Sequence, residues 1–144
     1  MKRILFAVAA LAIGATSVLA QSDPIATRKA TMKKVGDSVA PVGKMLKGEA
    51  PFDLATVQTA LSTIQDAAKV LPALFPDTAK TGGDTAALPH IWENKADFDA
   101  KYAKLGKDAA EASTKITDEA SFKANFPAVT KNCGGCHEIN RKKT

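Results

Sequence analysis

The spacing of apolar residues is the feature that most constrains how this sequence can fold. Stretches over residues 25–46, 54–71, 91–116 and 122–136 place apolar side chains three, four or seven positions apart. Such spacing puts them on one face of an α-helix. No stretch shows the period of two that is typical of a β-strand. The 144 residues suffice for one domain. The pattern therefore predicts an all-α fold, an antiparallel up-down-up-down four-helix bundle.

Capping residues indicate where these helices begin. Asp23 followed by Pro24 favours the start of the first helix, because the carboxylate can cap it and proline suits the first turn. Asp53 and Asp118 are candidate caps of the second and fourth helices. Asn94 is a candidate cap of the third helix, if the first turn of that helix starts late.

Prolines and small residues modify this pattern. Pro41 predicts a bend in the first helix. Pro127 allows two interpretations of the fourth helix: it is regular from its start, or its regular part begins only at Pro127. Residues 72–90 contain several prolines and paired glycines, so they predict a long connection, for which covering a ligand would be one reason. Small residues on the helical faces are expected to leave room for a large group in the core; they include Ala68, Ala109 and Ala112.

The amino-terminal residues predict export. Lys2 and Arg3 precede an apolar stretch, and small residues at the spacing of a cleavage site end at Ala20. We interpret residues 1–20 as a signal peptide cleaved after Ala20, which leaves residues 21–144 as the bundle domain. An uncleaved membrane anchor is the alternative, but it would need about twenty apolar residues, and this run is shorter.

The net charge and its distribution along the chain indicate whether the protein binds nucleic acid. Without residues 1–20 the net charge falls from +5 to +3, because two basic residues and no acidic ones are removed. The excess is spread along the chain rather than clustered, so we expect no nucleic-acid partner.

The stretch KNCGGCHEIN, residues 131–140, contains both cysteines and one of the two histidines of the chain. Cys133, Cys136 and His137 occupy positions i, i+3 and i+4, so they share a helical face. CxxCH is an attachment signal of c-type haem. The sequence therefore predicts haem bound to both sulfurs in the core of the bundle, with His137 as an axial ligand.

Two other chemistries use cysteines at this spacing. A reactive redox cysteine usually lies at a helix amino terminus after a strand, whereas this pair lies far along a helix. A zinc site needs four ligands, and the other obvious one is His90. Haem attachment is the favoured interpretation, because unattached thiols would tend to oxidise in an exported chain.

Two residues of the first helix are candidates for contact with the haem propionates and with the second axial position of the iron. Arg28 interrupts the apolar face; it either keeps its charge in water or pairs with a haem propionate, and we favour the propionate. Met32 lies early in the first helix and His137 late in the last, so antiparallel packing can bring them to similar heights. A thioether opposite an imidazole gives a six-coordinate iron suited to electron transfer; a methionine that only packs leaves the iron five-coordinate.

Several stretches together resemble the class II c-type cytochromes, the cytochrome c′ family. They are RKATMKKVG (28–36), MLKGEAPFD (45–53), LPALFP (71–76), PHIWENKADF (89–98) and KNCGGCHEINRKK (131–143). The resemblance implies one haem c per chain on Cys133 and Cys136, with His137 as the proximal ligand. It also implies Arg28 near a propionate and Arg141 beside the proximal face.

The family divides at the position of Met32. High-spin members leave the iron five-coordinate, while a low-spin branch uses methionine as the sixth ligand, and this sequence is more similar to the low-spin branch. Asn140 departs from the pattern, because the family usually has an aromatic residue before the arginine.

The function expected from these features is that of a periplasmic electron carrier with a His137/Met32-ligated haem, not that of an enzyme. The alternative is a five-coordinate haem protein that binds nitric oxide or carbon monoxide. Periplasmic or membrane-bound redox proteins are the expected partners. The resemblance also implies that a homodimer could form through the first two helices.

Overall fold

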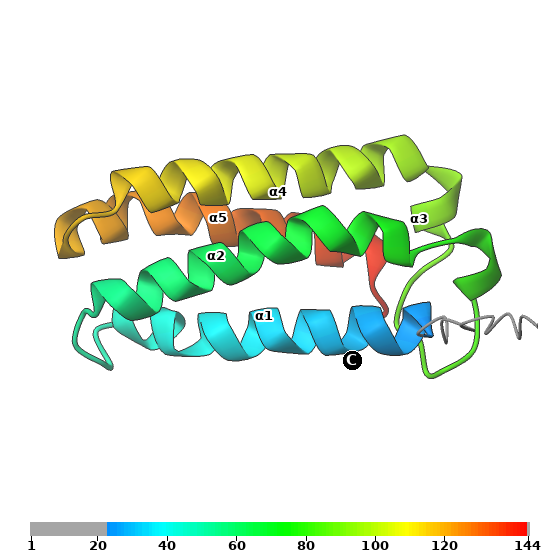
Figure 1. The fold of residues 1–144 in the computed structure, drawn as a ribbon, viewed down its shortest axis with the longest axis horizontal. Coiled ribbons are helices and arrows are strands. Elements are labelled where there is room, and N and C mark those ends of the chain that lie inside the picture. Colours follow the sequence, from blue (N-terminus) through cyan, green and yellow to red (C-terminus); the bar gives the residue numbers. More distant parts are fainter. Residues whose placement is uncertain (1–22, 144) are drawn as a thin grey trace, which may run out of the picture.

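The computed structural model describes residues 23–143, and its fold is the predicted bundle of four long helices. These are α1 (Pro24–Leu46), α2 (Leu54–Val70), α4 (Lys95–Lys115) and α5 (Glu119–Asn140). Successive long helices run in opposite directions, so the topology is up-down-up-down (Figure 1). The predicted signal peptide lies outside the described residues. Within the described part, no helix is long and apolar enough to cross a membrane.

Three of the predicted caps are confirmed by hydrogen bonds. A carboxylate oxygen of Asp23 accepts from the backbone N–H of Ile25 at 2.9 Å. Asp53 accepts from the first N–H groups of α2. Asp118 and Ser121 form a capping box, in which each side chain accepts from the backbone N–H of the other. Helix starts are therefore encoded by local side-chain chemistry.

The two internal prolines do not interrupt their helices. Pro41 lies inside α1, which continues to Leu46. Pro127 lies inside α5, which already begins at Glu119, so a regular helix that begins only at Pro127 is wrong. The capping box explains the earlier start, because it satisfies the first N–H groups well before the proline.

The predicted long connection between the second and third long helices contains three short helices. They are η1 (Leu71–Leu74), η2 (Asp77–Ala79) and α3 (His90–Glu93). Ile91 was expected in the third long helix, but it belongs to α3. Asn94 separates α3 from α4, because its backbone angles, φ −129° and ψ 47°, are not helical. The side chain of Asn94 makes no capping bond to α4. Its nitrogen lies 3.1 Å from Nδ1 of His90 instead.

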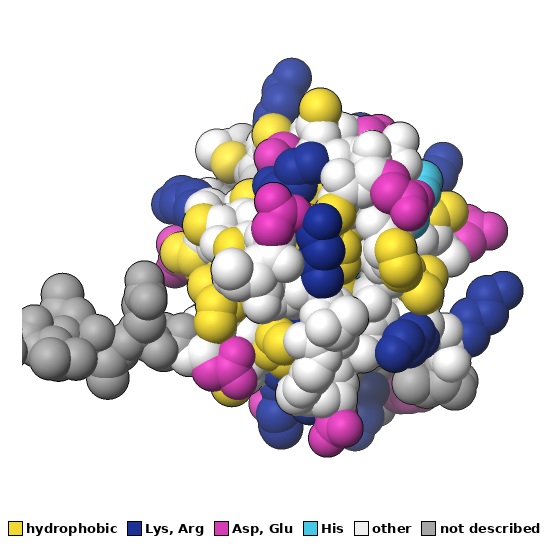
Figure 2. Space-filling model, turned by 90° about the vertical axis from the view of Figure 1, so that its right-hand side faces the viewer, with side chains coloured by type: hydrophobic (Ala, Val, Ile, Leu, Met, Phe, Trp, Pro, Cys, Tyr) yellow, Lys and Arg dark blue, Asp and Glu magenta, His cyan; other side chains and the backbone are white. Residues whose placement is uncertain are grey.

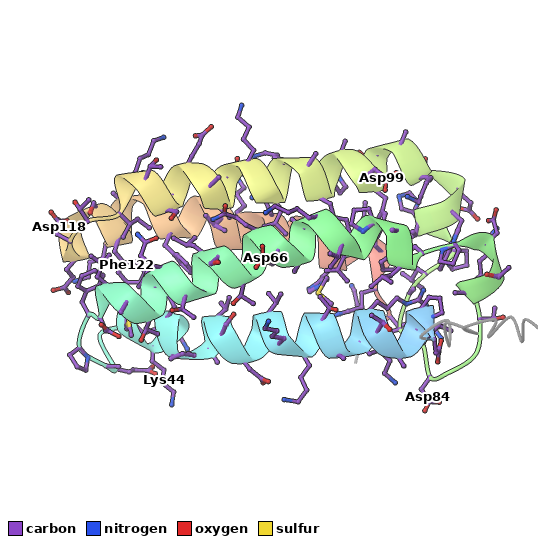
Figure 3. The ribbon with its side chains drawn as sticks, viewed as in Figure 1. Lys44, Asp66, Asp84, Asp99, Asp118 and Phe122 are labelled. Atoms are coloured by element: carbon purple, nitrogen blue, oxygen red, sulfur yellow. The ribbon has the colours of Figure 1, made fainter. Side chains whose placement is uncertain are left out.

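The core is tightly packed at the end of the bundle where α4 turns into α5. Val42 of α1, Leu61 of α2 and Phe122 and Phe126 of α5 are all fully buried there. Each large side chain buried in this way contributes about 1.5–3 kcal/mol. Figure 3 shows Phe122 at the end of the molecule opposite the connection that carries Asp84.

The helices pack in chain order: α1 on α2, α2 on α4 and α4 on α5. Small residues allow the approach of α2 to α4, since a Cβ atom placed on Gly106 would lie 3.3 Å from the Cβ of Ala68. Ala109 and Ala112 are buried within the packed core. The small residues thus bring helices together, and the expectation that they leave room for a ligand is wrong.

Within residues 23–143, α1 and α5 are not among the helix pairs with extensive backbone contact. They are joined at the other end of the bundle by a second buried cluster, which includes Phe75, Ile91, Phe98 and Tyr102. Met32 of α1 and Cys136 of α5 pack against this cluster. Figure 2 looks at this end, where basic, acidic and hydrophobic side chains are interspersed.

Candidate functional site

A cavity opens between α1 and α5 at this end of the bundle. It has about 610 Å³ of empty space, part of which is open to solvent. Its walls are mostly apolar, with charged side chains at α1 and at the end of α5. The lining residues are Arg28, Lys29, Met32, Phe75, Thr85, Ala86, Ala87, Ile91, Phe98, Tyr102, Cys136, His137, Asn140 and Arg141.

The CxxCH residues reach this cavity from the last turns of α5. Cys136 and His137 line it and are half-buried. Cys133 is also half-buried and lies one turn earlier, outside the set of lining residues. The two cysteines do not form a disulfide bond with each other. The structure therefore brings Cys136 and His137 to one space, with Cys133 beside it on the same helix.

The electrostatics of the two thiols do not resemble those of a redox cysteine. Burial raises the pKa of both Cys133 and Cys136. An activated redox cysteine has a lowered pKa, because the thiolate is the nucleophile. In residues 23–143, no group of three or more His, Cys, Asp or Glu side chains is arranged to hold a metal ion. The raised pKa values of the two thiols give the redox pair no support.

His137 is suited to bind a metal as a neutral imidazole. Burial, followed by the positive charge of Arg141, lowers the pKa of His137. Both effects disfavour the protonated ring, and only an unprotonated ring nitrogen can bind a metal. Arg141 itself is exposed at the rim of the cavity.

The guanidinium of Arg28 is buried in the wall of the cavity, with only 4% of the residue exposed. It donates to the backbone oxygen of Leu74 at 3.2 Å and to Oγ1 of Thr85 at 2.5 Å. Its carbon Cζ lies 4.7 Å from the centre of the Phe75 ring. Burial lowers its pKa, and Asp23 partly offsets the effect. The alternative in which this side chain leaves its charge in water is wrong.

Such a cation in an apolar wall favours an anionic partner. A buried charge is costly unless it is paired or well hydrogen-bonded. Arg28 has two neutral oxygen acceptors, yet a guanidinium offers five N–H donors. The remaining donors can receive a carboxylate of a ligand in the cavity.

Met32 lines the cavity from α1 and is half-buried. His137 lines it from α5. Because the first and last helices are antiparallel, residues early in α1 and late in α5 lie at the same end of the bundle (Figure 1). The expected juxtaposition of these two side chains at one cavity is confirmed.

A short pairing of two loop segments closes one side of the cavity, and the sequence did not predict it. Ala87 and Arg141 form an isolated antiparallel bridge. The N–H of Leu88 donates to the oxygen of Asn140 at 3.0 Å. Thr85 adds a link to α1, because its hydroxyl oxygen accepts from Arg28. Neither segment alternates polar and apolar residues, so this pairing leaves no pattern in the sequence.

Sequence reasoning also missed cavity residues that carry no chemistry of their own. Phe98 and Tyr102 were predicted as apolar residues of the third long helix, and the same periodicity could have placed them near the haem. Burial strongly raises the pKa of Tyr102, with a further contribution from nearby Cys136, so its hydroxyl is protonated at neutral pH. No pattern in the sequence pointed to Thr85 as a cavity residue.

The residues present fit a haem. Apolar side chains surround a space bounded on one side by Cys136 and His137, and a buried guanidinium faces it. The oxygen Oδ1 of Asn140, another lining residue, is buried without a hydrogen-bond partner in the described part of the chain. These features suit a group that is apolar over most of its surface and carries carboxylates at one edge.

Comparison with known proteins points to one family. The family model described as cytochrome c′ matches residues 23–141. A cytochrome c′ of Rhodopseudomonas palustris is 53% identical over 131 residues, 91% of this chain and 90% of its own. A cytochrome c-556 of the same organism is 36% identical over 147 residues, 99% of each chain.

The fold agrees with the sequence relationship. The solved structure of cytochrome c′ from Rhodopseudomonas palustris superimposes with a TM-score of 0.84 at 55% identity, over 86% of this chain and 99% of the other. Members of this family carry one covalently attached haem c per chain. This chain is thus a monohaem c-type cytochrome and belongs to the cytochrome c′ family, the class II c-type cytochromes.

Proposed function

We propose that this protein is a periplasmic electron carrier whose haem is bound to Cys133 and Cys136, with His137 and Met32 as axial ligands. The observation that carries the proposal is that Met32 and His137 enter one cavity from two different helices. The haem iron would supply one-electron chemistry. The role of the chain is to hold the ligands, limit access of water and set the reduction potential.

The remaining polar residues of the cavity have distinct roles in this proposal. Arg28 would pair with a haem propionate, since it lines the cavity and a guanidinium matches a carboxylate in shape. Arg141 would stand beside the proximal face, where its charge helps to keep His137 neutral. A buried cation near the haem favours the reduced state, because reduction removes one positive charge from the iron.

Localisation and partners follow from the same proposal. Residues 1–20 would act as a signal peptide cleaved after Ala20, which delivers the domain of residues 21–144 to the periplasm. Its partners would be periplasmic or membrane-bound redox proteins, and a homodimer would form through α1 and α2. No catalytic reaction is assigned to the chain, because every role given to its residues is one of binding or tuning.

The second candidate is a five-coordinate haem that binds nitric oxide or carbon monoxide. One observation favours it: the relative at 53% identity is named cytochrome c′, whereas the cytochrome c-556 is 36% identical. In that case Met32 would only pack over the haem. The two candidates differ in a single bond, that between the sulfur of Met32 and the iron.

The optical spectrum of the purified protein tests this bond. The proposal predicts a sulfur-to-iron charge-transfer band in the oxidised protein, and the band is lost in Met32→Ala. Met45→Ala is a matched control, because Met45 is a buried methionine of α1 in the packed core rather than in the cavity. This control should retain the band. High-spin spectra in both oxidation states, with rapid carbon monoxide binding, would contradict the proposal.

A further inference from the structure

Asn140 has a buried polar side chain that the roles assigned above leave unexplained. The residue is 5% exposed and lines the same cavity as His137. In residues 23–143, its Oδ1 is the one buried side-chain nitrogen or oxygen without a hydrogen-bond partner. A buried acceptor without a hydrogen-bond partner destabilises the folded state. Its environment therefore calls for a donor within the cavity.

The chemistry of Cys136 fixes which way the amide points. Nδ2 of Asn140 lies 3.6 Å from the sulfur of Cys136. A sulfur that has formed a thioether bond has no hydrogen to donate, so it can only accept. The amide nitrogen must then face Cys136, and Oδ1 is left on the other side of the group.

His137, which lines the same cavity, can supply a donor to that oxygen. It lies three residues before Asn140 in α5, and residues at this separation are neighbours on a helix surface. When one nitrogen of a histidine binds a metal, the other ring N–H almost always donates to a carboxylate, a carbonyl or water. The side-chain oxygen of Asn140 is such a carbonyl, and burial excludes competing water from it.

We propose that Asn140 is a positioning residue of the haem site, whose Oδ1 accepts a hydrogen bond from Nδ1–H of His137. The bond would fix the rotation of the imidazole and increase its electron donation to the iron, which favours the oxidised state. This inference rests on the proposed function, because it requires His137 to bind iron through Nε2.

The ring proton of His137 gives a direct test. NMR of the haem-bearing, reduced protein with isotopically labelled histidine measures how fast the Nδ1 proton exchanges with water. If the reduced iron is high-spin, the carbon monoxide complex is used, because it is diamagnetic. Asn140→Leu is expected to speed the exchange about tenfold, since it removes the acceptor. The midpoint potential should rise in the same variant.

Two further variants separate this role from a structural one. Asn140→Asp removes the amide donor to Cys136 but retains an acceptor oxygen. Because the acceptor is retained, the exchange of the His137 Nδ1 proton should stay slow, and the negative charge should lower the midpoint potential. Tyr102→Phe removes the hydroxyl donor on the same cavity wall and should leave the exchange unchanged. If Asn140→Leu does not fold, the wild-type protein still provides a test. A nuclear Overhauser contact is expected between the Nδ1 proton and the Asn140 amide protons.

The outcomes are distinguishable. A protein that loses all haem on denaturation overturns the proposed function and this inference with it. A haem-bearing protein in which Asn140→Leu leaves the exchange unchanged overturns the inference alone. The inference is equally wrong if Asn140→Asp exchanges as fast as Asn140→Leu, or if the wild-type protein shows no contact between the two side chains.

Discussion

Arg28 brings a positive charge into the apolar end of the bundle, and its two hydrogen bonds connect three segments of the chain. It joins α1 to the backbone of η1 through Leu74 and to the long connection through Thr85. The hydroxyl of Thr85 also accepts from the N–H of Ala87 at 3.1 Å. Arg28 and Thr85 should therefore act as a unit that holds the connection over the cavity.

A double-mutant cycle measures the interaction free energy between Arg28 and Thr85. Arg28→Met leaves the oxygens of Leu74 and Thr85 without their donor, so we expect it to lower the free energy of unfolding by about 1–3 kcal/mol. Thr85→Val should cost less, and the double variant should be less destabilised than the sum of the two, with a coupling of about 0.5–3 kcal/mol. Urea unfolding of the haem-bearing proteins checks both values. Strict additivity would contradict a direct interaction.

At the scale of single residues, the sequence predicted those whose chemistry is unusual for their position. Cys136 and His137 are identified by their spacing, and Arg28 by its charge on an apolar helical face. Thr85 is a polar residue of ordinary type, and it meets Arg28 in a space formed by distant segments. Asn140 was noted only as a departure from the family's pattern, and its burial could not be read from the sequence. Burial of that kind depends on tertiary packing, which the local pattern does not contain.

At the scale of helices, the close approach of α2 to α4 depends on Gly106. A Cβ atom there would meet the Cβ of Ala68 at 3.3 Å, whereas one on Gly36 of α1 would have nothing within 4 Å. Both glycines lie inside long helices, so they provide a matched comparison.

Substitution of the two glycines should have opposite effects. Gly106→Leu should force α2 and α4 apart and lower the free energy of unfolding by about 1–3 kcal/mol, as overpacking does. Gly36→Ala should raise it by about 0.5–1 kcal/mol, because alanine is the better helix former. Thermal and urea unfolding would measure both. Equal effects of the two substitutions would show that the contact between α2 and α4 is not tight.

The start of α5 should depend on pH. The carboxylate of Asp118 accepts hydrogen bonds from the side-chain hydroxyl and from the backbone N–H of Ser121, and these two bonds, the first more than the second, lower the pKa of Asp118. The folded pKa thus lies below the unfolded value of about 3.9, so the charged cap stabilises the fold above that pH and the effect is lost as pH falls through the folded pKa.

Asp118→Ala tests this linkage. The variant should be less stable than the wild type at neutral pH, and the difference should shrink in acid, measured by urea unfolding on both sides of pH ~3.9. Asp66→Ala is a control, because Asp66 is an exposed residue of α2, away from the start of that helix, and its pairing with Lys69 adds little. A difference for Asp118→Ala that persists unchanged in acid would contradict the role of the charge.

Helix positions were predictable because caps and apolar spacing are local. Asp23, Asp53 and Asp118 each mark a helix start in the sequence and in the structure. The break at Asn94 was only partly foreseen, since the backbone turns there to let α3 pack against the cavity, and that packing is not local.

At the scale of the whole molecule, the bundle has two ends with different tasks. One end is closed by Phe122, Phe126 and their neighbours, which pack without a ligand. At the other end α1 and α5 are separated by a cavity lined by Met32 and His137. The fold class and the positions of Cys136 and His137 at this cavity follow from the sequence, because the CxxCH residues share one face of the last helix. The closing of the cavity by residues 85–88 does not.

The central claim is that the chain carries a covalently attached haem, and the intact mass of the protein purified from the cells that produce it tests this claim most directly. We predict the mass of a chain that begins at Gln21 and carries one haem, retained under denaturing conditions because two thioether bonds hold it to Cys133 and Cys136. Replacement of both cysteines by alanine should remove the added mass. A wild-type protein whose denatured chain has no haem, with both thiols open to alkylation, would contradict the account.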